Sequence, residues 1–330
     1  MNMELKYKQR KSNLELYRIL VMLFIVAHHY VLKSGITDYM IENPFAFNSV
    51  CLNLIGMWGK TGINCFVLIT GYFMCTSEIT IKKFIKLLLE IEFYYITINT
   101  IFLISGYEKL TLSNIIYGYF PIKTLSYNFV GSYMIFYLFI PFLNILIRNL
   151  NKKQHLLLIL LCILIYSGIG TLPKIINSPN YITWFCILYT VSSYIRIWGF
   201  QYKISNRQWG IFTLIFIIFS MVSVIIIIYL SNKLNYQISS YYFVSDSNKI
   251  LAIATSFCSF MFFKEVKIKQ NKWINTIAAS TFGVLLIHDH SDAMRYFLWN
   301  VVYQNSYIIN TYPHLILLHA CLCIISLYTI

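Results

Sequence analysis

The sequence predicts an all-α integral membrane protein with about ten transmembrane helices and a cytoplasmic N-terminus. Of its 330 residues, 58% are hydrophobic and 12% are charged, whereas soluble domains average about 45–50% apolar and about 25% charged. The mean hydropathy is +0.65. So few charges cannot cover the surface of a soluble enzyme, and so much apolar content excludes a disordered chain.

Ten apolar stretches are candidates for the roughly 20 residues that a membrane-spanning helix needs. They are 14–32, 59–75, 84–105, 127–147, 155–169, 181–199, 209–230, 249–263, 273–288 and 312–330. The longest segments left outside the membrane are 33–58, 106–126 and 231–248. None of them is long enough for a separate soluble domain. We therefore expect a single transmembrane domain over residues 1–330, with a last helix that is truncated where the chain stops inside an apolar run.

The Lys and Arg residues set the expected orientation. Seventeen lie on the side of the N-terminus, seven on the other side and two, Arg18 and Lys60, within spans. The excess alternates from loop to loop, so the positive-inside rule places the N-terminus in the cytoplasm. Membrane orientation thus accounts for the net charge of +14, and we expect no nucleic-acid partner.

The first span carries the most informative ionisable residues, since a charge inside a bilayer costs about 2.5–3.5 kcal/mol on insertion scales. Arg18 and His29 are eleven residues apart, which places them on one helix face and roughly 16 Å apart along the axis. A donor with an anionic head and a long arm fits this spacing. Alternatively, Arg18 only fastens helices by pairing with Glu15 or Glu90, and His29 is a structural histidine.

Other polar residues near span ends are weaker candidates. Lys60 and Asn64 are expected level with His29 and could orient an acceptor or an oxyanion, although Lys60 could equally extend to the membrane surface. Lys83 and Lys86 form a basic rim at the cytoplasmic start of the third span. His288 and Asp289 end the ninth span on the outer side. His288 and His290 form a His-x-His pair that lacks a third metal ligand nearby, so no metal is expected. The eight cysteines all lie in or beside apolar runs, which favours buried thiols over disulfides.

Four stretches together resemble the acyltransferase family 3 transmembrane acyltransferases, especially bacterial O-acetyltransferases of surface polysaccharides. They are LELYRILVMLFIVAHH (14–29), GKTGINCFVLITGYF (59–73), YNFVGSYMIFYLFIPFLN (127–144) and STFGVLLIHDH (280–290). They occur in the family's order from the first span to the ninth.

The resemblance implies acyl transfer from cytoplasmic acyl-CoA to a hydroxyl of a cell-surface glycan or its lipid-linked precursor, in a bacterial plasma membrane. The family's Arg-x10-His pattern falls on Arg18 and His29. Its Arg-x-x-Arg motif falls on Lys83 and Lys86, a departure because lysine lacks the bidentate fork of arginine. The soluble domain fused to some relatives is absent, so the membrane domain acts alone or with a separate extracytoplasmic protein.

These residues lead to a mechanistic hypothesis. His29 is the general base, with His28 as the reserve, or it forms an acyl-histidine intermediate. Arg18 holds donor phosphates. A membrane transporter or flippase, or a small-ligand-binding membrane domain, is the competing interpretation, because buried charges in a polytopic protein also suit substrate movement.

Overall fold

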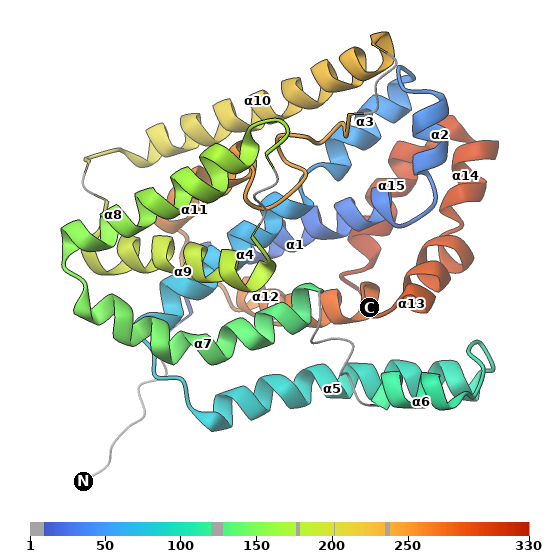
Figure 1. Ribbon diagram of the computed structural model, residues 1–330. Coiled ribbons are helices and arrows are strands. Elements are labelled where there is room, and N and C mark those ends of the chain that lie inside the picture. The colour runs from blue at the N-terminus through green and yellow to red at the C-terminus, as the bar shows by residue number, and fades with distance from the viewer. Residues whose placement is uncertain (1–9, 120–127, 176–178, 201, 235–237, 330) are drawn as a thin grey trace.

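The computed structural model describes residues 10–119, 128–175, 179–200, 202–234 and 238–329, and no β-strand occurs among them. Each of the ten predicted stretches coincides with a helix or a pair of helices (Figure 1). The helices are α1 (Ser12–Leu32), α2 (Thr37–Glu42), α3 (Phe47–Gly56), α4 (Gly59–Met74), α5 (Ile81–Ile104), α6 (Leu112–Tyr119), α7 (Phe129–Asn149), α8 (Lys152–Ile163), α9 (Tyr181–Trp198), α10 (Asn206–Lys233), α11 (Ile250–Glu265), α12 (Lys272–His288), α13 (Asp292–Tyr296), α14 (Asn305–Thr311) and α15 (Ile316–Ser326).

Six helical segments of the described chain are long and apolar enough to cross a membrane. They are Ser12–Leu32, Phe47–Met74, Ile81–Ile104, Phe129–Asn149, Lys152–Thr171 and Asn206–Lys233. A seventh span results if the bent pair Asp292–Thr311 and Pro313–Ser326 crosses as one unit. The protein is therefore a helical membrane protein. The number ten remains a prediction, because α9, α11 and α12 do not meet the same length and composition criteria.

The second span begins earlier than the sequence predicts. Residues 33–58, expected as an outer segment, contain α2 and α3, and α3 continues through a turn at Met57 and Trp58 into α4 as one 28-residue segment. Buried polar residues such as Ser49 and Asn53 interrupt the apolar run of α3, so no unbroken apolar stretch marks it. As a consequence, Lys60 lies near the middle of this segment and not at its outer end.

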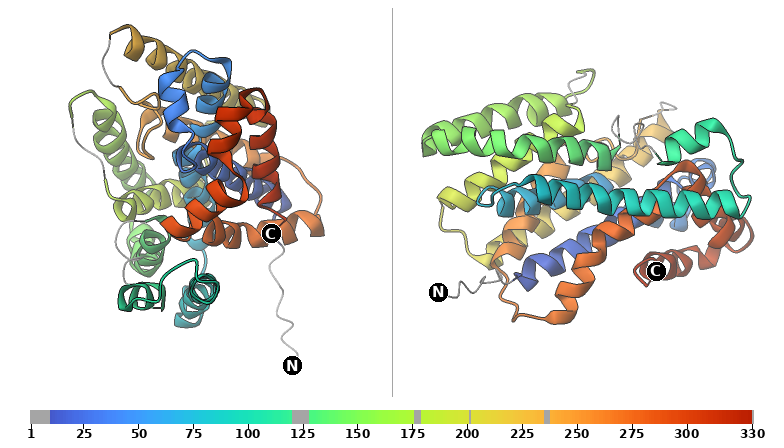
Figure 2. Two further views of the ribbon diagram at one scale, coloured as in Figure 1. Left: turned by 90° about the vertical axis from the view of Figure 1, so that its right-hand side faces the viewer. Right: turned by 90° about the horizontal axis from the view of Figure 1, so that it is seen from below.

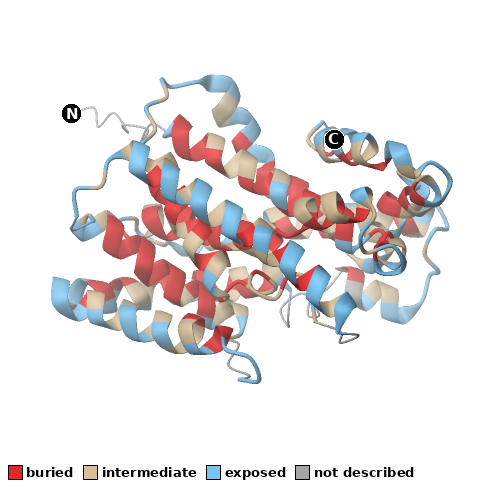
Figure 3. Ribbon diagram, turned by 90° about the horizontal axis from the view of Figure 1, so that it is seen from above, coloured by how far each residue is buried: buried red, intermediate tan, exposed pale blue. Residues whose placement is uncertain are grey.

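Burial separates inner helices from outer ones. In the most apolar window, 72% of the α3–α4 segment is buried, against 28% in α5 and 22% in α10. Buried residues gather along the centre of the bundle, and exposed residues lie on the outer helices (Figure 3). The exposed side chains of α10 are mostly Ile, Leu and Phe, as expected of a helix that faces lipid.

Polar side chains mark where the helices begin. Asn128 of α7, Asn180 of α9 and Asn271 of α12 each accept a hydrogen bond from a backbone N–H of the first turn. Ser205 and Gln208 form a reciprocal capping box at the start of α10. These contacts satisfy N–H groups that would otherwise be unpaired at helix starts.

The C-terminal helices lie against the first one (Figure 2). At its start, α1 contacts α12 through Ser12, whose hydroxyl donates to Asn275 Oδ1 at 2.9 Å and accepts from the backbone N of Asn271 at 2.9 Å. The two helices therefore start side by side and run in the same direction. This pairing determines which residues meet at their far ends.

Candidate active site

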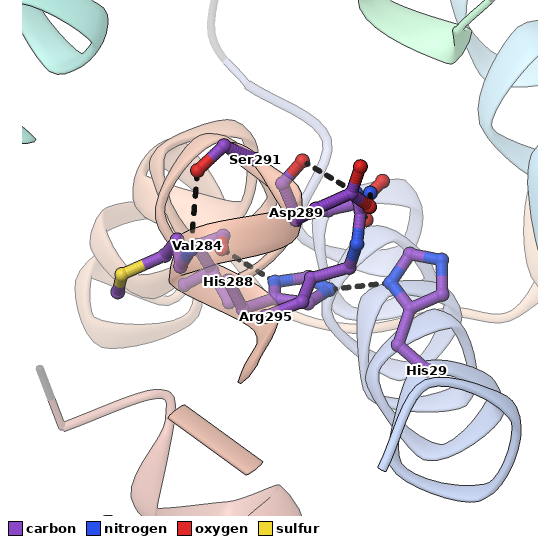
Figure 4. A network of polar contacts seen from close by, with 8 residues as sticks. His29, Val284, His288, Asp289, Ser291 and Arg295 are labelled. Atoms are coloured by element: carbon purple, nitrogen blue, oxygen red, sulfur yellow. Dashed lines mark hydrogen bonds and ion pairs between the residues drawn. The ribbon is translucent and has the colours of Figure 1, made fainter. Parts of the chain in front are cut away.

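His29 and His288 meet at the far ends of α1 and α12. His29 lies seventeen residues after Ser12, and His288 lies seventeen residues after Asn271, so both follow the contact at the helix starts by the same distance. Nδ1 of His29 is 2.9 Å from Nε2 of His288, and the ring centroids are 5.0 Å apart (Figure 4). Equal rise per residue in the two parallel helices brings the imidazoles level.

The hydrogen-bond partners define which ring nitrogen carries each proton. Nδ1 of His288 is 2.6 Å from the carbonyl oxygen of Val284, and a carbonyl can only accept. Nδ1 of His288 is therefore the donor, which leaves Nε2 as an acceptor for Nδ1–H of His29. When both imidazoles are neutral, this series of hydrogen bonds ends at Nε2 of His29, which carries an available lone pair. His288 thus orients His29 as a proton acceptor.

Asp289 and Arg295 form an ion pair beside the two histidines. The Arg295 guanidinium donates to Asp289 Oδ1 at 2.8 Å and also pairs with Asp292. Burial raises the pKa of Asp289, but the neighbouring His29, His288 and Arg295 lower it further, so the net pKa lies below its usual value. Asp289 is therefore a carboxylate at neutral pH, and a negative charge beside an imidazole favours its protonated form.

His28 faces away from this pair. Its Nδ1 is 2.5 Å from the carbonyl oxygen of Gly56, so Nδ1 donates and Nε2 is the acceptor. The imidazole lies directly on Gly59, where an added Cβ would overlap the ring. The ring also lines a cavity of about 940 Å³ between α1, α2, α10 and the segment before α11. The two adjacent histidines therefore have different neighbours: His29 contacts His288, and His28 contacts Gly56 and the cavity.

Lys60 and Asn64 lie one helical turn apart on α4 but make different contacts. Lys60 Nζ donates to the Tyr181 hydroxyl at 2.5 Å and lines the same cavity as His28. The Asn64 amide is fully buried, donates to the Ser247 carbonyl at 2.7 Å and accepts from Trp184 Nε1 at 2.8 Å. Asn64 thus connects α4 to α9 and to the segment before α11, so its amide is not free to orient a substrate.

Arg18 lies on α1 at the opposite end from the histidines. Its Nη1 pairs with Glu15 at 3.0 Å, and its guanidinium lies 5.9 Å from the ring centroid of Phe66. The guanidinium has five N–H donors, and one goes to Glu15. Among the described residues, Glu90 forms no ion pair with Arg18. Of the two partners predicted for Arg18, Glu15 is the one that forms the ion pair.

The basic residues near the N-terminal ends of the helices are dispersed. Lys83 and Lys86 are both exposed on the first turns of α5, and Lys83 donates to the carbonyl of Glu78. A separate cavity of about 610 Å³ is lined by Arg10, Lys272 and Asn275 at the starts of α1 and α12. This cavity has no sequence signature, because Arg10 and Lys272 are ordinary basic residues that flank apolar stretches.

The comparison with protein families decides the classification. The model of acyltransferase family 3, described as an acyltransferase domain, matches residues 11–330. The chain belongs to acyltransferase family 3. This membership identifies a membrane acyltransferase and supports an enzyme over a transporter. Neither the curated proteins nor the solved structures contain a match to this acyltransferase.

Three contributors to this candidate site were not singled out from the sequence. They are the carbonyl groups of Val284 and Gly56 and the side chain of Arg295. Backbone carbonyls have no residue signature, although a histidine in the last turn of a helix does lie within reach of the carbonyl four residues before it. Arg295 had been counted only as one of the seven basic residues expected on the outer side.

Proposed function

We propose that this acyltransferase moves an acetyl or other short acyl group from cytoplasmic acyl-CoA to a hydroxyl of a cell-surface polysaccharide or its lipid-linked precursor. The contact between His29 and His288 carries the proposal, because it leaves Nε2 of His29 as a proton acceptor. The proposal places the protein in a bacterial plasma membrane with its N-terminus in the cytoplasm, where a separate extracytoplasmic protein can deliver the glycan.

His29 acts as the general base in this proposal. As the acceptor oxygen attacks the thioester carbonyl, its proton moves to Nε2 of His29. The carbon–sulfur bond then breaks, and the proton passes from His29 to the departing sulfur. The products are an acyl ester and the thiol of CoA. The imidazolium that forms is stabilised by the Asp289 carboxylate.

The donor reaches His29 from the cytoplasmic end. Arg18 retains N–H donors beyond the one that pairs with Glu15, and guanidinium groups bind phosphate oxygens through two parallel hydrogen bonds. Arg18 and His29 are eleven residues apart on α1, which corresponds to roughly 16 Å. The pantetheine arm spans this distance, while Lys83 and Lys86 attract the phosphates at the membrane surface.

The experiment is transfer of labelled acetyl from acetyl-CoA to isolated surface glycan by the purified protein in lipid nanodiscs. We expect His29→Ala to lower the rate by at least about 100-fold, the lower range for loss of a general base. His314→Ala is the matched control, since His314 is an exposed histidine on another segment. Normal transfer by His29→Ala at equal protein level would refute the assignment, and movement of unmodified glycan without CoA would indicate a transporter.

A further inference from the structure

The cavity that His28 lines has no role in the proton-transfer chain. Its volume is about 940 Å³, enough for several sugar residues. His29 is not among the side chains that line it. Hydroxyl and amide side chains contribute much of the lining, including Asn53, Asn232 and Ser239. These groups can hydrogen-bond a polar molecule, and apolar side chains such as Leu32, Met40 and Val244 supply the rest of the lining.

His28 offers a hydrogen-bond acceptor to this cavity. Its Nδ1 is committed to the Gly56 carbonyl, so Nε2 is left to accept a hydrogen bond. Buried polar groups in native proteins are nearly always hydrogen-bonded. A ligand hydroxyl that donates to Nε2 of His28 would satisfy this nitrogen.

The charge of the lining selects among hydroxylated molecules. Lys60 donates one of its three N–H groups to Tyr181, which leaves two for a ligand. No Asp or Glu lines this cavity among the described residues. A negatively charged ligand is therefore favoured there, and a cationic amino sugar is disfavoured because nothing compensates its charge.

We infer that this cavity binds the acceptor, and that it selects a hydroxyl-rich molecule bearing a carboxylate or a phosphate. His28 binds one of its hydroxyl groups, and Lys60 binds its negative charge. This inference rests on the proposed function, and it assigns His28 to acceptor binding and not to proton transfer. His28 immediately precedes His29 on α1, so this cavity adjoins the base although His29 does not line it.

The test measures binding to the purified protein in nanodiscs without any acyl-CoA. The probes are hexagalacturonate for a carboxylate, ribitol 5-phosphate for a phosphate, and maltohexaose as the neutral reference. We expect one of the anionic probes to bind at least tenfold more tightly than maltohexaose. Lys60→Met should remove that preference, whereas Lys233→Met, which removes an exposed charge outside the cavity, should retain it. Equal binding of all three probes would overturn the inference.

A cavity-filling variant separates this inference from the proposed function. Ser239 is exposed at the cavity wall, so Ser239→Trp narrows the cavity at a tolerant position. We expect it to raise the KM for the glycan at least tenfold with the KM for acetyl-CoA unchanged. Unchanged acetylation by Ser239→Trp would refute the acceptor site and leave the acyltransferase proposal standing. Binding of an anionic probe to the wild type without any acetyl transfer would support the binding site and refute the acyltransferase proposal.

Discussion

Nδ1 of His29 and Nε2 of His288 are 2.9 Å apart, although 259 residues separate them in the chain. The contact joins α1 to α12, and it extends through His288 to the Val284 carbonyl. Histidine bases in other enzymes are positioned in the same way. One ring nitrogen donates to an orienting acceptor, and the other ring nitrogen takes the proton. Here a second imidazole occupies the orienting position.

His288 is a positioning residue in this arrangement, so its loss should lower kcat more than it changes either KM. We expect His288→Leu to lower kcat by about 10- to 150-fold, the equivalent of a hydrogen bond to a group that becomes charged, about 1.5–3 kcal/mol. His288→Gln retains an amide oxygen that can accept from His29 and should restore part of the rate. Steady-state kinetics with labelled acetyl-CoA measures both variants. Equal rates for His288→Leu and His288→Gln would show that a hydrogen-bond acceptor at position 288 does not contribute to the rate.

Arg18 and Glu15 can be separated by substitution, because they form an ion pair in which only one member is expected to touch the donor. Arg18→Ala should raise the KM for acetyl-CoA by about 10-fold or more, as expected for loss of a charge-assisted phosphate contact. Glu15→Gln leaves the guanidinium in place and should change this KM little. If both variants instead lower the amount of folded protein equally and leave the KM unchanged, the pair only fastens the helix.

Gly59 allows α4 to approach the ring of His28, and an added methyl group has no room there. We expect Gly59→Ala to destabilise the protein by about 1–3 kcal/mol through overpacking. Gly168→Ala is the matched control, since its Cβ would make ordinary contact with Leu164 at 3.6 Å. Thermal unfolding of the two variants in the same detergent checks the difference. A Gly59→Ala protein as stable as the wild type would contradict the close packing.

The orientation of the chain can be tested by labelling. In a variant without native cysteines, a cysteine at Lys109, after α5, should react with a membrane-impermeant maleimide in intact cells. A cysteine at Lys152, at the start of α8, should react only after the cells are opened. These outcomes follow from the positive-inside rule. The opposite pattern would place the N-terminus outside, and labelling of both positions in intact cells would refute the order of these spans.

The fold class and the positions of most helices could be predicted from the sequence, because apolar stretches and basic flanks are local signals. The segment α3 could not, since Ser49 and Asn53 interrupt its apolar run and their burial depends on how the helices pack. The pairing of Arg18 with Glu15 followed from helix periodicity, but no ion pair with Glu90 forms within the described part of the chain.

The candidate site shows the same division between local and distant contacts. His29 and His288 were each singled out, yet their contact depends on how α1 packs on α12, which no local pattern encodes. Asn64 was expected to orient a substrate, but its amide is engaged by Trp184 and Ser247 from distant segments.

The parallel pairing of α1 with α12 also has a consequence for biosynthesis. Ribosomes add about 5–20 residues per second, so α1 emerges roughly 13–50 s before its partner. During that interval His29 lacks its orienting neighbour, and the start of α1 lacks Asn271 and Asn275. The nascent first helix must therefore be shielded by lipid, by the insertion machinery or by α4 until the last third of the chain arrives, and catalytic competence is acquired only near the end of translation.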